Sequence, residues 1–153
     1  KSETALELIR QGNVLVSDDR VDVQHIHNNI IGHAPAIIKG LLEIRGIGVI
    51  DVEKMFGAMS LAEKAQIDLV VKLVPFESGA EYNRIGDETM RYTKILGAAI
   101  PTLILPVSAG RNTAALVESA VTNFRLLQAG FNSSDEIRDR FRNYSELNKE
   151  SDK

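Results

Sequence analysis

The chain has 153 residues and contains no cysteine, no signal-peptide pattern and no long uninterrupted hydrophobic run. Without cysteine, no disulfide framework and no thiolate metal site can form, which fits a reducing compartment. The longest apolar stretch, residues 98–107, is interrupted by Pro101 and is too short to span a bilayer. We therefore expect a cytoplasmic protein without a membrane-spanning segment.

An excess of charge of either sign is also absent. Lys and Arg number 18, Asp and Glu number 21, and the formal net charge is −3. This balance predicts no binding to nucleic acid or to an anionic membrane, and it leaves basic residues to act as individual anion contacts. The composition, 44% hydrophobic and 25% charged, is that of an ordinary soluble protein, and the length suits one domain.

Helical and extended patterns alternate along the chain. Apolar residues recur at helical spacing in residues 3–11, 36–42, 52–57, in the segment between PVSAGRN and Gly130, and in 133–153. Extended patterns occupy residues 13–17, 21–26, 67–74, 90–95 and 100–107, and the almost continuously apolar 67–74 is expected to be a central strand. Since several strands follow one another directly, we predict an α/β fold with a mixed sheet and flanking helices.

The last 21 residues differ from the rest in being highly charged. Their only apolar line is Ile137, Phe141 and Leu147. We expect residues 133–153 to form an exposed helix that needs a partner surface and ends in a disordered tail.

A lysine followed by serine at the start of a helix is the pattern that ends a Walker A phosphate-binding loop. The lysine neutralises phosphate charge, the hydroxyl holds Mg²⁺, and preceding glycines let backbone N–H groups surround the phosphates. Lys1 and Ser2 match the last two positions. We therefore expect the glycines to precede Lys1, so that the chain begins inside its own loop. Chance occurrence of so short a motif is the alternative.

Two adjacent carboxylates, Asp18 and Asp19, follow the extended segment 13–17. Ligands in open α/β sheets bind beyond the carboxyl ends of strands, where this pair is expected to lie. One aspartate there would accept a proton from a hydroxyl group, and the other would orient it or bind a metal through water. A solvated turn is the alternative.

Glu43 and Arg45 are separated by one residue and are followed by two glycines, in a segment that we expect at the end of the helix 36–42. The glutamate suits a Mg²⁺ shell and the arginine suits bidentate binding of phosphoryl oxygens, with a simple ion pair as the alternative.

Arg84 and Arg111 lie in glycine-containing loops, and Arg111 precedes a helix N-terminus, which is a ready anion site. Surface arginines without a bound anion, the more usual case, are the alternative.

Six segments, taken in this order and spacing, resemble the bacterial HPr kinase/phosphorylase family: KSETALELI, DDRV, LEIRGIGVIDVEKMFGA, YNRIG, PVSAGRN and NFRLLQAG. The resemblance runs from residue 1 to about 130, and the LEIRGxGxI block is specific to that family. It implies a P-loop catalytic domain over residues 1–132, with a core similar to the nucleotide-binding part of phosphoenolpyruvate carboxykinase. A C-terminal helix and tail, 133–153, would follow.

The resemblance also implies the activity. Members of the family use Mg²⁺ and either ATP or pyrophosphate to phosphorylate a serine of HPr, the phosphocarrier of the sugar phosphotransferase system. They remove that phosphate by attack of inorganic phosphate, and the balance controls carbon catabolite repression. They assemble as hexamers, and HPr docks near the C-terminal helices.

Carried over by position, the resemblance implies one role for each residue of the acidic and phosphate-contacting set. Lys1 would contact phosphate, and Ser2 and Glu43 would belong to the metal site. Asp19 would take the proton of the substrate serine, and Asp18 would support it. In the reverse direction the same aspartate would act as the acid.

The arginines complete the set that the resemblance implies. Arg45 lies in a block needed for both reactions, Arg84 matches the arginine of a YDRLG loop, and the loop that ends at Arg111 is tied mainly to dephosphorylation. Three positions depart from the family pattern: Ser108 stands where a basic residue is usual, Asn83 replaces the aspartate of YDRLG, and Met59 replaces a usual small residue. A small-molecule P-loop kinase or carboxykinase relative, and a catalytically silent module that senses phosphate or nucleotide, are the alternatives.

Overall fold

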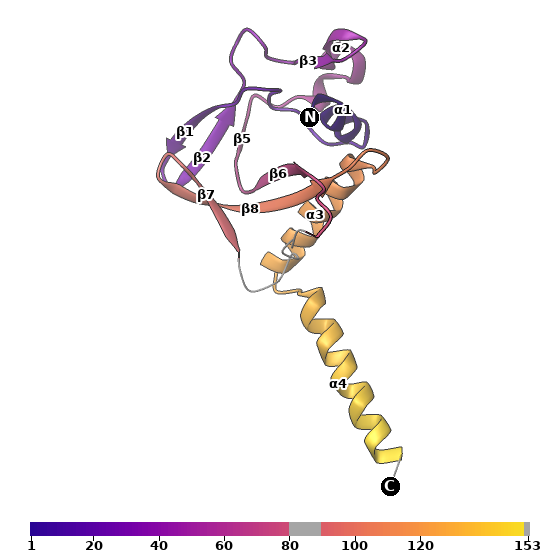
Figure 1. Ribbon diagram of the computed structural model, residues 1–153. Helices are drawn as coiled ribbons and strands as arrows, with labels where there is room; N and C mark the ends of the chain where they lie inside the picture. Colours follow the sequence, from indigo (N-terminus) through magenta and orange to yellow (C-terminus); the bar gives the residue numbers. More distant parts are fainter. Residues whose placement is uncertain (80–89, 152–153) are drawn as a thin grey trace.

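The computed structural model describes residues 1–79 and 90–151. The helices are α1 (Ser2–Arg10), α2 (Val52–Phe56), the 3₁₀ helix η1 (Ala58–Ser60), α3 (Thr113–Gln128) and α4 (Ser133–Ser151). The strands are β1 (Asp22–Ile26), β2 (Asn29–His33), β3 (Leu41–Ile44), β4 (Gly48–Asp51), β5 (Lys64–Gln66), β6 (Val70–Pro75), β7 (Arg91–Ile95) and β8 (Ala98–Val107). Figure 1 shows α1 and the β3–β4 hairpin at one end of the body, with the sheet of β6, β7 and β8 and helix α3 below them.

The sheet beside α3 has the order β6-β8-β7, in which β8 pairs parallel with β6 and antiparallel with β7. The expected α/β fold with a mixed sheet is therefore confirmed. The expectation that residues 67–74 form a central strand is wrong, because β8 occupies the centre and β6 pairs with β8 alone among the described strands. The N–H of Ile67 bonds to the carbonyl of Ile30, so this part of the apolar run belongs to the neighbouring β1-β2-β5 sheet.

Residues 36–44 correct another expectation, since they do not form a helix. Turns lead to Gly40, whose φ of +74° suits glycine far better than other residues, and the chain then enters β3. In β3 the side chains of Leu42 and Ile44 are buried and Glu43 points out, which is the two-residue period of a strand. β4 pairs with it antiparallel, with Glu43 opposite Val49.

The expected strand at residues 13–17 is reduced to a single parallel bridge between Leu15 and Leu61. Leu15 uses both its N–H and its carbonyl in that bridge, bonding to the carbonyl of Ser60 at 2.8 Å and to the N–H of Ala62 at 3.0 Å. At this bridge the segment runs parallel to the chain around Leu61, and the two aspartates follow it directly.

Two hydrophobic clusters support the body. The first joins α1, the β3–β4 hairpin and the start of α2, and its buried members are Ile9, Leu15, Leu42, Ile44, Ile50 and Val52. The second joins β8 to α3 through Leu103, Leu105, Ala120 and Phe124. α1 packs against both β3 and α3 and so links the two clusters. Each fully buried aliphatic side chain contributes about 1.5–3 kcal/mol, which fixes the hairpin and α1 relative to each other.

Helix α3 has well-defined ends. The side chain of Asn112 accepts the N–H of Ala115 at 3.0 Å, and Gly130 has a φ of +95° just after the helix.

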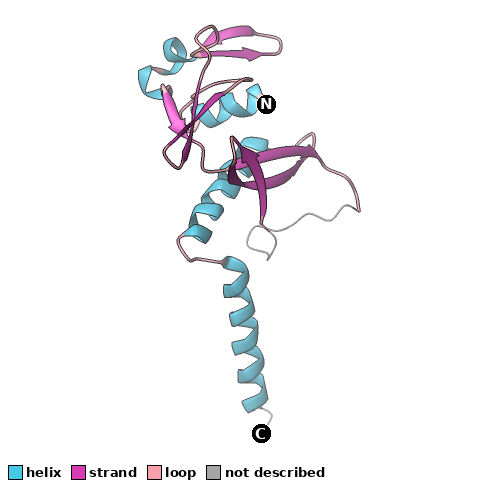
Figure 2. Ribbon diagram, turned by 90° about the vertical axis from the view of Figure 1, so that its left-hand side faces the viewer, coloured by secondary structure: helices cyan, strands magenta, loops and turns pink. Residues whose placement is uncertain are grey.

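The next helix, α4, projects away from the body in two perpendicular views (Figures 1 and 2). Its side chains Ile137, Phe141 and Leu147 are each more than half exposed, so the expected exposed helix is confirmed. In the part of the chain that the structure describes, no helix is both long and apolar enough to cross a bilayer.

Candidate active site

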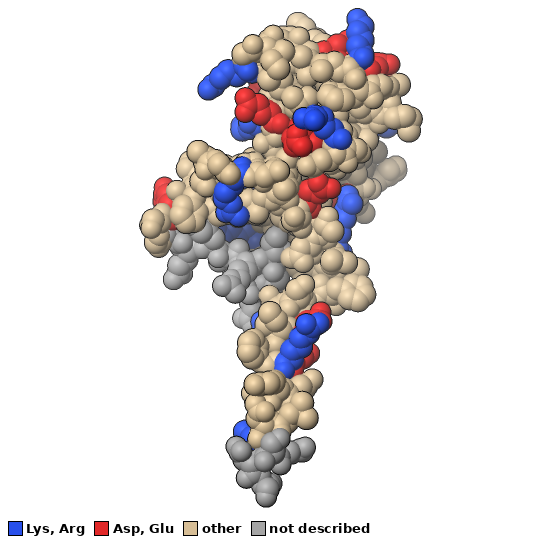
Figure 3. All heavy atoms as spheres, turned by 90° about the vertical axis from the view of Figure 1, so that its right-hand side faces the viewer, with Lys and Arg blue, Asp and Glu red and all other residues tan. Residues whose placement is uncertain are grey.

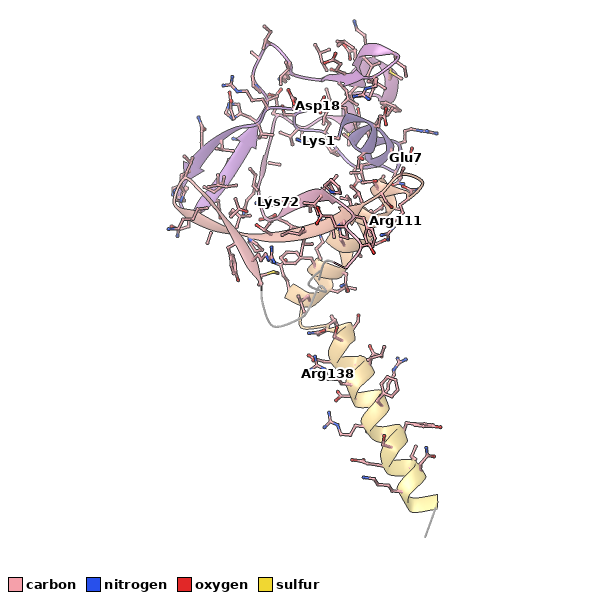
Figure 4. All side chains as sticks on the ribbon, viewed as in Figure 1. Lys1, Glu7, Asp18, Lys72, Arg111 and Arg138 are labelled. Carbon is pink, nitrogen blue, oxygen red and sulfur yellow. The ribbon has the colours of Figure 1, made fainter. Side chains whose placement is uncertain are left out.

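One polar hollow of about 580 Å³ lies at the end of the body that carries the amino terminus. It is lined by Lys1, Ser2, Glu3, Asp18, Asp19, Glu43 and Arg45. Three segments that are far apart in the sequence meet there: the start of α1, the turn after residue 17, and β3 with its following turn. Figure 4 shows Lys1 and Asp18 side by side in this region. We call this hollow the charged cavity.

Helix α1 brings Lys1 and Ser2 to the charged cavity. Its first turn contains Glu3, and the side chain of the N-cap residue, Lys1, makes no capping hydrogen bond. The N–H groups of a first helical turn lack intrahelical partners, and together with the helix dipole they favour an anion at this end. The hydroxyl of Ser2 donates to both carboxylate oxygens of Asp18, at 3.0 and 3.2 Å. This bond ties the start of α1 to the turn that carries the aspartates.

The turn at residues 17–20 brings both aspartates to the same cavity. Consecutive residues of an extended chain point in opposite directions, so the placement requires a change in the backbone. Asp19 supplies it with a φ of +54°, in the left-handed region that few residues other than glycine, asparagine and aspartate adopt. Asp18 is half-buried, and Asp19 is exposed to solvent.

The β3–β4 hairpin supplies the third wall. Leu42 and Ile44 anchor β3 in the first hydrophobic cluster, and the alternation of the strand leaves Glu43 exposed on the cavity side. Arg45 follows in the hairpin turn, where Gly46 and Gly48 have φ values of +86° and +101°. The two glycines allow the tight reversal that keeps Arg45 beside the cavity.

The donor atoms of the charged cavity fit a magnesium ion. Ser2, Asp18 and Glu43 present hydroxyl and carboxylate oxygens, the ligands that Mg²⁺ prefers. No cluster of three or more His, Asp or Glu side chains close enough to hold a metal occurs in residues 1–79 or 90–151. Mg²⁺ is usually held by one or two carboxylates together with water and substrate phosphates, so this arrangement suits a metal that arrives with a nucleotide.

The remaining candidates from the sequence are Arg111, Ser108, Arg84 and Asn83. Arg111 is not among the residues that line the charged cavity, and Figure 4 shows it near the start of α3, apart from Lys1 and Asp18. Ser108 belongs to the same loop after β8. Arg84 and Asn83 lie outside the described residues. Sequence reasoning missed Glu3, which lines the cavity; an acidic residue in the first turn, beside Ser2, was the available signal.

The sequence matches a known domain family over nearly its whole length. The family described as "HPr Serine kinase C-terminal domain" matches residues 1–141. The chain belongs to this family. The resemblance inferred from the six sequence segments is thereby confirmed.

Relatives of known sequence and structure agree with the family assignment. The chain is 44% identical over 141 residues, 92% of its length, to an HPr kinase/phosphorylase of Caldicellulosiruptor bescii, and 43% identical over 140 residues to one of Bacillus subtilis. These matches cover 45% and 44% of the two relatives, so the chain spans a little under half of their length.

A solved structure of an HPr(Ser) kinase/phosphatase from Coxiella burnetii is 36% identical, with a TM-score of 0.79. The alignment covers 90% of this chain and 83% of that one. The two chains therefore share a fold.

Proposed function

We propose that this chain contributes the catalytic site of a Mg²⁺-dependent protein-serine kinase/phosphorylase whose substrate is the phosphocarrier HPr. ATP or pyrophosphate would be the phosphoryl donor. The single observation that carries the proposal is the charged cavity, in which a lysine, an arginine, a hydroxyl and four aspartate or glutamate side chains from three separate segments surround one space. The membership of the chain in the HPr serine kinase domain family supports the choice of protein substrate.

Each wall of the charged cavity has a role in binding the donor. Lys1 and the N-terminus of α1 neutralise the phosphate charge, as in a P-loop whose core resembles that of phosphoenolpyruvate carboxykinase. Ser2 and Asp18 would hold the metal, which P-loop enzymes bind through a serine or threonine and a nearby aspartate. Glu43 would supply a further carboxylate to the metal site from β3. The metal, when bound with the donor, neutralises charge that develops on the phosphate oxygens.

The proposed chemistry is transfer of one phosphoryl group to the oxygen of a serine side chain. Asp19 accepts the hydroxyl proton while that oxygen forms a bond to phosphorus and the bond to the leaving phosphate oxygen breaks. Arg45 binds the phosphoryl oxygens through its guanidinium group. In the reverse direction, an oxygen of inorganic phosphate attacks the phosphorus of phosphoserine, Asp19 returns the proton to the serine oxygen, and pyrophosphate leaves.

Two further arginines would approach from loops. Arg84 in YNRIG would complete the phosphate contacts, and Arg111, before α3, would act mainly in dephosphorylation. Ser108 in the same loop replaces a basic residue of the family pattern, so we expect kinase activity to exceed phosphorolysis. We also propose that the protein acts in the cytoplasm as a homo-oligomer, a hexamer by family likeness, and that its reaction controls carbon catabolite repression.

The proposal is tested by phosphoryl transfer to HPr. The chain, preceded by the corresponding upstream part of the Caldicellulosiruptor bescii relative, is incubated with HPr, Mg²⁺ and ATP or pyrophosphate. We expect mass spectrometry to show one phosphate on a serine of HPr. Because a positioned base contributes about 10²–10⁴-fold, Asp19→Asn should lower the rate by that factor.

The control variant is Asp22→Asn, which changes a carboxylate that pairs with Arg20 at 2.9 Å and does not line the charged cavity. Its rate should stay within about twofold of the parent. Equal rates for Asp19→Asn and the parent would remove Asp19 from the mechanism. Transfer to a metabolite with HPr left unmodified would favour a small-molecule kinase, and nucleotide binding without any transfer would favour a silent sensing module.

A further inference from the structure

The placement of Asp19 in the charged cavity depends on an unusual backbone turn. The N–H of Arg20 donates to the carbonyl of Asp18, which closes a three-residue turn with Asp19 at its centre. A bond between residues two apart, around a central residue with φ of +54°, is the strained form of a γ-turn. An aspartate left to itself would relax to a negative φ, which would turn its carboxylate to a different side.

The side chain of Ser17 forms hydrogen bonds to the backbone of this turn. The hydroxyl of Ser17 lies 3.2 Å from the carbonyl oxygen of Asp18 and also donates to the carbonyl oxygen of Arg20. These two carbonyls flank Asp19 on either side. Among the described residues, Ser17 is the only one whose side chain is seen to bond to the backbone of residues 18–20. The guanidinium of Arg20 pairs instead with the carboxylate of Asp22.

Ser17 lies on the other side of the turn from the proposed chemistry. It does not line the charged cavity, and it lines a separate hollow of about 560 Å³ between α1, α3 and the segment that precedes β6. It cannot therefore touch the reacting atoms as placed, and any effect it has on catalysis must pass through the turn.

We propose that Ser17 is a positioning residue that keeps Asp19 in its left-handed conformation and thereby keeps the carboxylate of Asp19 directed into the charged cavity. Asp18 is held separately, because its carboxylate accepts the hydroxyl of Ser2. The proposal rests on the function proposed above for Asp19. Its consequence is specific: removal of the Ser17 hydroxyl misplaces the base and leaves the binding of the phosphoryl donor to Lys1, Ser2 and the N-terminus of α1 intact.

The test compares Ser17→Ala with Ser17→Thr in the chain extended as described above. We expect Ser17→Ala to lower kcat by about 10–100-fold, because displacement of a catalytic group by about 1 Å has an effect of that order. The KM for ATP should change by less than about twofold, because the substitution leaves the residues that bind ATP in the ground state unchanged. Ser17→Thr, which keeps the hydroxyl, should retain most of kcat. A KM increase at unchanged kcat, or equal losses in both variants, would overturn the proposal.

A double-variant cycle separates positioning from a general structural role. In an Asp19→Asn background, Ser17→Ala should lower kcat no further, because the group that it positions is already missing. An additional loss equal to that in the parent would contradict the proposal. The matched control is Ser60→Ala, which removes a serine hydroxyl that donates to the carbonyl of Gly57 in another turn of the same half. It should leave kcat unchanged even where it lowers stability.

A structural measurement keeps the two proposals distinguishable. Crystal structures of the parent and of Ser17→Ala report the φ of Asp19 whether or not HPr is phosphorylated. We expect a positive φ in the parent and in Ser17→Thr, and a negative φ in Ser17→Ala. If Ser17→Ala fails to fold, Ser17→Cys takes its place, because a thiol is a much weaker donor. An unchanged positive φ overturns the role of Ser17, whereas a parent without HPr phosphorylation overturns only the proposed function.

Discussion

The half of the body that contains α1 and the β3–β4 hairpin differs from the half that contains β8 and α3. In the first, strands of four residues and short turns enclose a small cluster, and all seven residues of the charged cavity come from it. In the second, a ten-residue strand packs on a sixteen-residue helix, and it contributes nothing to that cavity among the described residues. The comparison teaches that the turns beside a small core place the charges, while the long elements bury apolar surface.

The comparison predicts its largest effect at Phe124, which is 3% exposed in the cluster between β8 and α3. Phe124→Ala should lower the free energy of unfolding by about 3–5 kcal/mol, since it removes buried surface and leaves a cavity. Denaturant unfolding measures the loss, and Leu126→Ala on the exposed side of α3 is the control. Activity per folded molecule should remain that of the parent. A selective loss of kcat would mean that the two halves are not separable.

The next largest effect is expected at the charged cavity, where a substitution should lower activity without lowering stability. Arg45→Ala removes an exposed guanidinium from the charged cavity and should lower kcat/KM for HPr phosphorylation by about 10²–10³-fold, as loss of one stabilising donor does. The unfolding midpoint should not move.

The control for Arg45 is Arg10→Ala, which changes an exposed arginine at the end of α1 that pairs with Glu7 at 3.4 Å. Its rate should match that of the parent. Equal rates for the Arg10 and Arg45 variants would show that position beside the cavity has no bearing on phosphoryl transfer.

A smaller effect is expected at the start of α3. Asn112→Ala removes the side-chain oxygen that accepts the N–H of Ala115 at 3.0 Å and should lower the free energy of unfolding by about 1 kcal/mol. Asn112→Asp, which keeps an acceptor at the cap, should recover the loss. If Asn112→Asp and Asn112→Ala are equally destabilised, the cap does not stabilise α3.

The smallest effect is expected on α4, where opposite charges lie side by side on the surface (Figure 3). Arg138 pairs with Asp135 at 3.2 Å, and both side chains are well exposed. Solvent screens such a pair, so Arg138→Ala should change the free energy of unfolding by about 0.3 kcal/mol or less. A change above about 1 kcal/mol would show that α4 is packed against something that these charges help to hold.

Much of the fold follows from the sequence because its strongest patterns are local. The apolar stripe of α3 and its Gly130 stop, and the period of α1, require only neighbouring residues. The prediction of a helix over residues 36–42 was wrong because Ile37, Ile38 and Leu41 fit a helical spacing as well as they fit a turn that leads into a strand. If Gly46 and Gly48 had been interpreted as part of a hairpin turn, Glu43 would have been placed on a strand and Arg45 in the turn that follows it. The single bridge of Leu15 could not be predicted, since its partner is 46 residues away in the chain.

The candidate site was predictable as a set of residues and less so as a geometry. The order of the sequence segments, through their resemblance to the family, predicted that Lys1, Asp18 and Glu43 belong to one site. The structure places all three around one cavity. The direct bond between Ser2 and Asp18 and the left-handed backbone of Asp19 depend on the tertiary contacts of α1 and the hairpin. Arg111 lies apart because the loop that carries it is fixed by β8 and α3, elements of the other half.

The central claim is that the charged cavity holds the phosphates of the donor. The most direct measurement is a crystal structure of the extended chain with Mg²⁺ and a non-hydrolysable ATP analogue. We expect the terminal phosphates beside Lys1 and the N-terminus of α1, with the metal in contact with Ser2 and Asp18. Phosphates bound elsewhere, with the charged cavity filled by water alone, would contradict the account.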